Sequence, residues 1–234
     1  TLLVICLPLV AAVVALLARP GSAAGPRAGY LLNAAGLGFA LVLLVSSLSS
    51  EATGLVFAPG GDAWLGVAAD RLGALLLVMV CGVSTVVQAF AGRYLHGDIR
   101  QRRFFVAANL LAAATALMVL SVTLVGLAAG WTLAGLSLLM LLGMYPGVAA
   151  ADTGTRRTAI AFLAGDAALW VAVIVATATW GSIDLREIGA AGMAESNGLA
   201  LTCVACLAVI AALSRSGQIP FQTWLPMTVA VPTP

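Results

Sequence analysis

The sequence predicts an all-α fold, a polytopic bundle of transmembrane helices in which the seventh helix is discontinuous. Hydrophobic residues make up 62% of the 234 residues and charged residues only 9%, and the mean hydropathy is +1.10. This composition leaves too little polar surface to cover a soluble protein of that length. The apolar residues are gathered into runs, and most of the arginines lie between the runs. These observations place the chain in a membrane.

Seven apolar runs predict seven membrane spans. A bilayer core of ~30 Å requires about 20 helical residues, and the runs cover residues 2–18, 30–48, 72–91, 104–120, 124–144, 158–180 and 199–213. Residues 104–151 carry no charge, but one helix of that length would extend about 70 Å, far beyond a bilayer. We therefore expect a turn at Ser121, Val122 and Thr123, the most polar interruption of this stretch.

The segment 49–71 is long for a connection between neighbouring helices. Its Pro59-Gly60-Gly61-Asp62 sequence is typical of a turn, and a short alternating apolar stretch lies on each side. This pattern predicts a small external hairpin. An irregular loop is an equally good interpretation of the same residues.

The arginines predict the orientation. If the spans alternate, loops 19–29, 92–103 and 145–157 share one side and carry eight arginines, whereas loops 49–71 and 181–198 carry two. The positive-inside rule places the first set in the cytoplasm and the N-terminus outside. The first run lacks the charged start and the cleavage site of a signal peptide, so we expect it to remain as a helix. The start without Met and the end within a motif indicate a piece of a longer protein.

Patterns typical of soluble enzymes are missing from the sequence. The single histidine, His96, lies in a basic loop, and Cys203 and Cys206 have C-x-x-C spacing inside an apolar run, without a second pair. No glycine-rich phosphate loop follows a strand, and the net charge of +2 gives no indication of nucleic-acid binding. We therefore expect no catalytic site, no metal and no cofactor in this chain.

Two charges interrupt the apolar runs, Asp166 within the sixth and Arg215 just after the seventh. A charge at mid-bilayer costs at least ~2.5–3.5 kcal/mol, so such residues face the bundle interior or a hydrated cavity. Alternatively, Asp166 is an interfacial residue and Arg215 a cytoplasmic anchor. The backbone after Arg215 favours the first interpretation. Gly217 and Pro220 interrupt the helix before apolar residues resume, and such breaks occur only where they are buried in protein or line water. This predicts an ion-handling site.

The residues around this helix break resemble a known family of membrane proteins. The stretch "SRSGQIPFQTWLPMTVAVPTP" resembles the broken seventh helix of the antiporter-like proton-conducting membrane subunits, found in respiratory complex I and in Mrp-type antiporters. Upstream, "DRLGALLLVMV", "GRYLHGDIRQRRFF", "AAGWTLAGLS" and "FLAGDAAL" follow in the family's order. The resemblance covers roughly residues 60–234. It implies that residues 1–58 form N-terminal helices and the start of the external loop, and that 59–234 form the first part of the antiporter-like domain, truncated at Pro234.

The resemblance implies an ion path, with some departures. The family carries a Glu after the tryptophan and a Lys in the seventh helix, whereas this chain has Thr132 and Arg215. Threonine does not ionise, and arginine does not readily release a proton. Asp166 matches the family's aspartate of the sixth helix, and a histidine of the eighth helix would lie beyond Pro234. The expected ion path therefore comprises Arg215, Asp166 and Thr132, with polar neighbours Ser216 and Gln218 at a helix break formed by Gly217 and Pro220.

These departures favour one branch of the family. The stretch "GWTLAGLSLLMLLGMYPG" most resembles the DabB-type membrane subunit of inorganic-carbon accumulation complexes. That likeness implies a bacterial inner-membrane protein that couples a cation gradient to CO2 or bicarbonate uptake by a large zinc-binding peripheral subunit. Its partners would be that subunit and membrane lipid, not nucleic acid. Two alternatives remain: an L-like proton-translocating subunit of NADH:quinone oxidoreductase or an Mrp-type antiporter, and a non-conducting scaffold.

Overall fold

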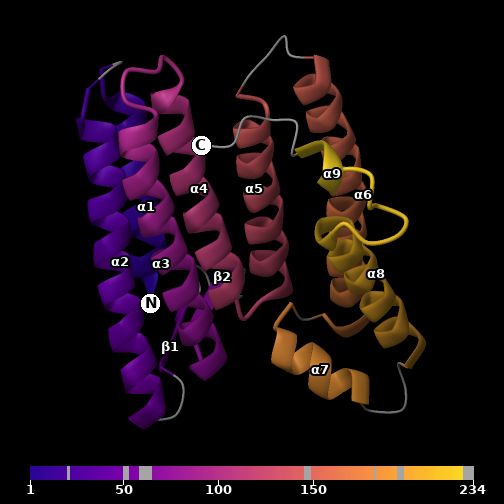
Figure 1. The fold of residues 1–234 in the computed structure, drawn as a ribbon. Coiled ribbons are helices and arrows are strands. Elements are labelled where there is room, and N and C mark those ends of the chain that lie inside the picture. The colour runs from indigo at the N-terminus through magenta and orange to yellow at the C-terminus, as the bar shows by residue number, and fades with distance from the viewer. Residues whose placement is uncertain are drawn as a thin grey trace.

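The computed structural model of the protein describes residues 1–19, 22–49, 53–57, 65–144, 149–181, 183–193 and 198–228. These residues form a helical bundle with a two-stranded sheet at one end (Figure 1). The long helices are α1 (Leu2–Leu17), α2 (Ala24–Ser49), α3 (Arg71–Tyr94), α4 (Gln101–Leu120), α5 (Leu124–Leu142), α6 (Ala149–Trp180) and α8 (Gly198–Ser216). The shorter elements are β1 (Thr53–Phe57), β2 (Leu65–Ala69), α7 (Leu185–Met193) and α9 (Leu225–Thr228). Each of the seven predicted runs corresponds to a helix, which confirms the predicted all-α bundle.

Six of these helices, α2 to α6 and α8, are long and apolar enough to cross a membrane. Helix α1 is equally apolar, but its 16 residues extend only about 24 Å. Helix α6 is longer than predicted, because it begins at Ala149 and not near residue 158. Arg156 and Arg157 therefore lie inside a helix, and the expected loop 145–157 is wrong from Ala149 onward. A 32-residue helix extends about 48 Å, so its first turns can project beyond a ~30 Å bilayer core and keep these arginines at the surface.

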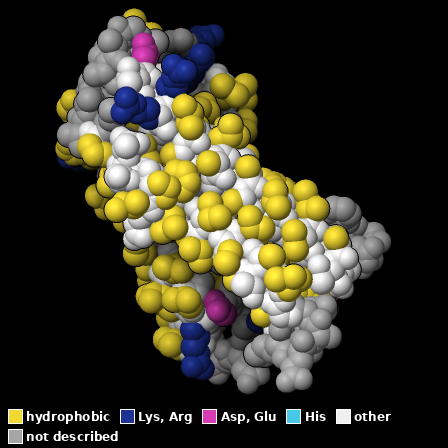
Figure 2. Space-filling view, turned by 90° about the vertical axis from the view of Figure 1, so that its right-hand side faces the viewer, with side chains coloured by type: hydrophobic (Ala, Val, Ile, Leu, Met, Phe, Trp, Pro, Cys, Tyr) yellow, Lys and Arg dark blue, Asp and Glu magenta, His cyan; other side chains and the backbone are white. Residues whose placement is uncertain are grey.

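The helices pack as two groups that lie side by side (Figure 1). In the first group α2 packs on α3, and α1 packs on both α2 and α4; in the second, α6 packs on α5 and α8, and α4 packs on α5 to join the groups. Small residues fill many of the contacts, and the fully buried alanines include Ala11, Ala15, Ala128 and Ala176. Small side chains let helix backbones approach closely in lipid. Figure 2 shows hydrophobic side chains over the middle of the surface and arginines towards its ends, the pattern of a multi-pass membrane protein.

The predicted turn at residues 121–123 separates α4 from α5. Thr123 begins α5, and its Oγ1 accepts a hydrogen bond from the Gly126 N–H at 3.1 Å. The turn also supports the two-stranded sheet, because the Val122 N–H donates to the Gly66 carbonyl of β2 at 2.9 Å. A side chain at residue 66 would overlap Val122, so this close approach requires glycine.

The sheet is the predicted hairpin. Strands β1 and β2 pair antiparallel, with Thr53 opposite Ala69 and Phe57 opposite Leu65, so the irregular-loop alternative is wrong. The predicted turn residues 59–62 lie outside the described ranges. Helix α7 was not predicted, because loop 181–198 has no apolar run. Its nine residues are too few to cross a bilayer, and it lies at the same end of the bundle as the hairpin (Figure 1).

The discontinuous seventh helix is confirmed. Helix α8 ends at Ser216, and Gly217 has a φ of +62°, a conformation that glycine adopts without steric cost. The Gln218 N–H donates to the Leu213 carbonyl at 3.3 Å, which closes the end of the helix. The chain becomes helical again only at Leu225, in α9. The break lies between an arginine and an apolar segment, as the sequence predicts.

Candidate functional site

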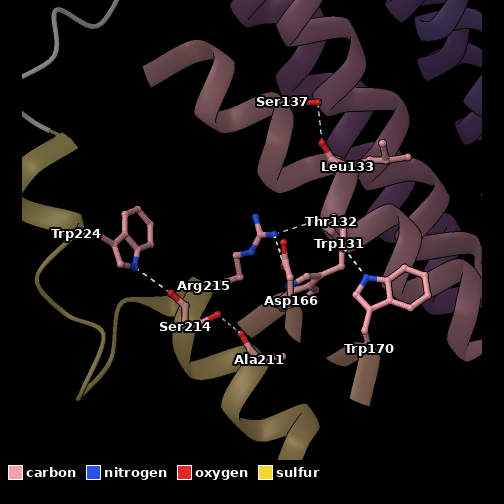
Figure 3. Close-up of polar contacts among 10 residues, drawn as sticks. All are labelled: Trp131, Thr132, Leu133, Ser137, Asp166, Trp170, Ala211, Ser214, Arg215 and Trp224. Carbon is pink, nitrogen blue, oxygen red and sulfur yellow. Dashed lines mark hydrogen bonds and ion pairs between the residues drawn. The ribbon is translucent and has the colours of Figure 1, made fainter. Parts of the chain in front are cut away.

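The two charges that interrupt the apolar runs form an ion pair. Arg215, in the last turn of α8, places its Nη2 2.9 Å from the Oδ1 of Asp166 in α6 (Figure 3). The same Nη2 donates a hydrogen bond to the backbone carbonyl of Trp131 in α5, also at 2.9 Å. One guanidinium group therefore links three helices, α5, α6 and α8.

The pair lies inside the bundle. The side chains of Arg215 and Asp166 are 17% and 15% exposed, and Asp166 lies near the middle of α6 because that helix begins well before the predicted start. A buried charge without a partner would cost several kcal/mol. Each residue supplies the opposite charge that the other needs. The position is thus unlike that of an interfacial carboxylate or of a solvated arginine anchor.

The guanidinium also rests on aromatic rings and on a glycine. The Cζ of Arg215 lies 4.0 Å from the ring centroid of Phe162 and 5.3 Å from that of Trp131, within the range of cation–π attraction. On the α5 side it packs against Gly135, where an added Cβ would lie only 2.6 Å from Nη1 and 2.7 Å from Cζ. The absence of a side chain at residue 135 is what leaves room for the planar group.

A second glycine brings α6 and α8 together beside the pair. A Cβ on Gly165, which precedes Asp166, would overlap the hydroxyl of Ser214, which precedes Arg215. Ser214 is fully buried, and its Oγ donates to the Ala211 carbonyl of its own helix at 2.8 Å. The close contact of these backbones fixes the distance across which the charged side chains meet.

The chain after the break folds back onto the site. The Trp224 Nε1–H donates to the Ser214 carbonyl at 2.9 Å, so one of the backbone groups that the break frees is satisfied within the protein (Figure 3). The ring of Trp224 stands edge-on to that of Phe162, with centroids 5.2 Å apart. Phe162 therefore contacts both the guanidinium and the segment beyond the break.

The other residues of the expected ion path lie around the pair without touching it. Thr132 accepts a hydrogen bond from the Trp170 Nε1–H at 3.1 Å, which joins α5 to α6 (Figure 3). Ser216 is exposed and donates back to the Ala212 carbonyl at 2.7 Å. Gln218 uses its backbone to close α8, and its side chain is exposed. Gly217 and Pro220 lie in the break, and the peptide bond before Pro220 is cis.

Two hydrogen-bond donors at the site have no partner among the described residues. They are the Nε–H of Arg215 and the Nε1–H of Trp131, and both nitrogens are buried. Buried donors are almost always satisfied in folded proteins, by protein groups or by water. The two nitrogens are therefore positions at which a water molecule can accept a hydrogen bond. Within the described ranges, no group of three or more His, Cys, Asp or Glu side chains gathers that could hold a metal ion.

Sequence reasoning missed four parts of this site. The Trp131 contact uses a backbone carbonyl, for which a sequence carries no signal. Gly135 and Gly165 are two of 25 glycines, so composition does not single them out. Phe162 is one aromatic residue within an apolar run. Only the two charges and the glycine and proline of the helix break were unusual enough to be predicted from the sequence.

Comparison with known proteins identifies the family. Residues 59–105 match a family described as NADH-ubiquinone oxidoreductase (complex I), chain 5 N-terminus, and residues 121–234 match one described as NADH:quinone oxidoreductase/Mrp antiporter, transmembrane. Together the two matches include the ion pair, the helix break and all of α3.

Individual relatives agree with these matches. The chain is 27% identical to NADH-quinone oxidoreductase subunit L of Mycobacterium tuberculosis over 244 aligned residues, which cover 100% of this chain and 38% of the relative. It is 31% identical to the probable inorganic carbon transporter subunit DabB1 of Halothiobacillus neapolitanus, over 74% of this chain and 32% of the relative. The chain thus spans only about a third of the length of these relatives.

A solved structure shows the same fold. The Mrp complex from Dietzia sp. DQ12-45-1b superposes with a TM-score of 0.81 at 25% sequence identity, covering 98% of this chain and 25% of the matched chain. The fold, the two family matches and the relatives all lead to the same assignment. This chain belongs to the family of antiporter-like membrane subunits that NADH:quinone oxidoreductases and Mrp antiporters share.

Proposed function

We propose that this chain forms part of a proton path through the membrane, and that the pair of Asp166 and Arg215 controls passage along it. The observation that carries the proposal is the buried contact between Asp166 Oδ1 and Arg215 Nη2, at 2.9 Å beside a broken helix. Buried charges and broken helices are both costly in lipid, and both are characteristic of ion pathways.

The two partners have different roles. Arginine stays charged under all ordinary conditions, so Arg215 acts as a permanent positive charge and Asp166 is the member of the pair that can accept a proton. A proton on Asp166 would leave the guanidinium buried without a counter-charge, which costs ~3–5 kcal/mol. That cost favours either release of the proton or movement of Arg215 towards water at the break. In this way the protonation of Asp166 is coupled to the position of Arg215 at the end of α8.

The unsatisfied donors support a hydrated path. Arg215 Nε and Trp131 Nε1 are buried next to the pair and unpartnered among the described residues. Water molecules at these two nitrogens would bring a hydrogen-bonded chain to Asp166. Thr132 is not ionisable, and its hydroxyl already accepts a hydrogen bond from Trp170. It would therefore line the path without carrying a proton.

The coupled process is inorganic-carbon uptake in this proposal. One line of support is the departure from the family pattern, because Thr132 and Arg215 stand where the family has a glutamate and a lysine. The other is the likeness to two probable inorganic carbon transporter subunits, at 31% and 32% identity. The protein would lie in the bacterial inner membrane, with loops 19–29 and 92–103 in the cytoplasm. A large zinc-binding peripheral subunit would be its partner.

A second candidate is an L-type subunit of NADH:quinone oxidoreductase. It is favoured by the subunit L of Mycobacterium tuberculosis, whose alignment covers all of this chain, whereas that of DabB1 covers 74%. The two candidates share the proton path and differ in the complex to which it belongs. Purification of the full-length protein from its native membrane in mild detergent, followed by identification of the co-purifying chains, separates them.

Proton flux tests the path itself. The full-length protein is reconstituted into vesicles with its co-purifying subunits, and flux is followed with an internal pH dye. Asp166→Asn keeps the size and removes the ionisable group, so we expect flux to be lost while membrane insertion is unchanged. Asp98→Asn is the matched control, because Asp98 only caps a turn by accepting from the Arg100 N–H and asparagine can do the same. Normal flux in Asp166→Asn would show that the proton does not pass through Asp166, whereas an absence of flux with the wild-type protein would support the non-conducting scaffold.

A further inference from the structure

A pocket of about 380 Å³ lies at the other side of the bundle from the ion pair, between the ends of α2, α3 and α4. Its polar lining includes side chains from these three helices and from the connection between α3 and α4: Arg27, Tyr30, Gln88, Arg93, His96 and Gln101. Small residues, among them Ala89 and Gly92, form the rest of the wall. A pocket of this volume is large enough for a small ligand or a headgroup.

The pocket is positively charged. Arg27 and Arg93 line it, and no acidic residue is among the described residues that do so. In the described part of the chain, neither arginine has an ion-pair partner. The ring of His96 and the hydroxyl of Tyr30 are further hydrogen-bond donors. Arginine pairs bind phosphate oxygens with good geometry, so this lining fits a phosphate group.

The depth of the pocket fits a lipid. It opens at the helix ends that carry most of the arginines, where a headgroup layer would lie. Gln88 lies five residues, about 8 Å, further into the bundle than Arg93. The residues next to the lining on the outer surface of α2 and α3, Leu31, Phe90 and Tyr94, are large and exposed. A ligand with both a phosphate and an acyl chain would contact the arginines and this apolar surface together.

The floor of the pocket is rigid. Gln88 is 1% exposed, and its Nε2 donates to Ser84 Oγ at 3.0 Å and to Asn109 Oδ1 at 3.1 Å. Asn33 Nδ2 donates to the same Asn109 oxygen at 2.7 Å, so buried polar groups of α2, α3 and α4 are tied together. Because Asn109 Nδ2 donates to the Phe105 carbonyl, its Oδ1 must be the acceptor, and this fixes which way the Gln88 amide points.

The remaining atom of this amide is an unused acceptor. Gln88 Oε1 is buried and has no hydrogen-bond partner among the described residues. It lies against Gly29 of α2, where an added Cβ would overlap it. The pocket therefore offers donors and positive charge at its mouth, above a floor that the Gln88 side chain closes.

We propose that this pocket binds the phosphate of an anionic phospholipid headgroup, such as that of phosphatidylglycerol. Basic pockets between transmembrane helices bind anionic headgroups by the same physical chemistry. The site is separate from the ion pair, and it does not depend on which ion the protein conducts.

Lipid retention tests this site. The full-length protein is placed in nanodiscs of phosphatidylcholine with a minor fraction of phosphatidylglycerol, and the bound lipids are measured by native mass spectrometry. The double variant Arg27→Gln/Arg93→Gln should bind phosphatidylglycerol about 25-fold more weakly, since each basic residue near an anionic headgroup contributes about 1 kcal/mol. The control is Arg102→Gln/Arg103→Gln, which removes the same charge from two exposed residues outside the pocket.

Two further measurements sharpen the result. Ala89→Phe fills the pocket and keeps both arginines, so it should also lose phosphatidylglycerol. If the lipid were held only by the positive charge of the surface, Ala89→Phe would retain it. Inorganic phosphate, titrated in discs of phosphatidylcholine alone, distinguishes a soluble anion from a headgroup. If the protein binds inorganic phosphate, and both the double variant and Ala89→Phe abolish that binding, the pocket is a phosphate site. Its ligand would then be a soluble anion and not a lipid headgroup. Equal phosphatidylglycerol retention in the pocket variants and in the control would overturn the proposal.

Discussion

Gly135 of α5 lies against the guanidinium of Arg215, so closely that a Cβ on residue 135 would lie 2.7 Å from Cζ. The same guanidinium reaches Asp166 at 2.9 Å. The glycine and the ion pair are therefore one arrangement: the planar charged group reaches its partner because α5 has no side chain in the way.

Gly135→Ala should disrupt the ion pair without altering either charged residue. The added methyl group has to displace the guanidinium, and overpacking of this kind costs ~1–3 kcal/mol. We expect a lower melting temperature for the full-length protein in detergent and a reduced proton flux in vesicles. Gly38→Ala on α2 is the control, because a Cβ there meets nothing within 4 Å. A melting temperature that falls equally in both variants would show that the contact with Arg215 is unimportant.

Arg215→Lys should rescue Gly135→Ala in part. Lysine has a compact ammonium group on a slender chain, so it does not occupy the space above residue 135 that the guanidinium fills. The penalty for Gly135→Ala should therefore be smaller in the Arg215→Lys background, with a coupling free energy of about 0.5–3 kcal/mol between the two sites. The four proteins of this double-mutant cycle are compared by thermal unfolding and by flux. Strict additivity would mean that Gly135 does not select arginine over lysine.

Arg215→Met should abolish proton flux and destabilise the protein. Methionine has a similar length but no charge, so Asp166 is left buried without its partner at a cost of ~3–5 kcal/mol. Arg215→Lys should retain part of the flux, because the charge survives. Arg186→Met, at an exposed position on α7, is the control for the loss of an arginine. Wild-type flux in Arg215→Met would mean that Arg215 is only an anchor and has no role in proton conduction.

Most of the helical fold could be predicted because lipid imposes a simple rule on sequence. Each span must be a long apolar run, so the sequence itself identifies the spans. The turn at residues 121–123 could be predicted because a single helix over residues 104–151 would be far longer than a bilayer is thick. Helix α7 was missed because it does not cross the bilayer and needs no such run. The start of α6 was placed too late because Arg156 and Arg157 end the apolar run, although a helix can continue into the headgroup layer and beyond.

The candidate site was predictable in its two charges and in the helix break after Arg215, but not in the contacts around them. Asp166 and Arg215 stand out because ionised groups are rare in apolar runs. The amides of Asn33, Gln88 and Asn109 are buried even more deeply than this pair, but an uncharged polar residue is common in membrane helices and carries no such signal. Contacts that depend on a backbone carbonyl or on a missing side chain, as at Trp131 and Gly135, become visible only in three dimensions.

Cysteine labelling tests the predicted orientation. Ile99 lies in the turn before α4 and is 94% exposed, and Gly189 is exposed on α7 at the opposite end of the bundle. In a background without Cys6, Cys81, Cys203 and Cys206, Ile99→Cys should react with an impermeant thiol reagent only from the cytoplasmic side. Gly189→Cys should react only from outside, because the positive-inside rule predicts that the arginine-rich end faces the cytoplasm. Reaction of both from one side would contradict an odd number of crossings between them.

Trp224→Phe should loosen the helix break while leaving the charges in place. Phenylalanine keeps the ring that packs on Phe162 but removes the N–H that donates to the Ser214 carbonyl at 2.9 Å. A buried carbonyl without its partner costs ~1–3 kcal/mol, and here that carbonyl belongs to the residue before Arg215. We expect a lower melting temperature and a faster exchange of backbone amides near the end of α8, measured by hydrogen–deuterium exchange. Trp180→Phe is the matched control, because the Nε1–H of Trp180 is buried and has no partner among the described residues; removing that N–H breaks no hydrogen bond, so its melting temperature should hold or rise. If Trp224→Phe behaves like Trp180→Phe, the break does not depend on the hydrogen bond from Trp224.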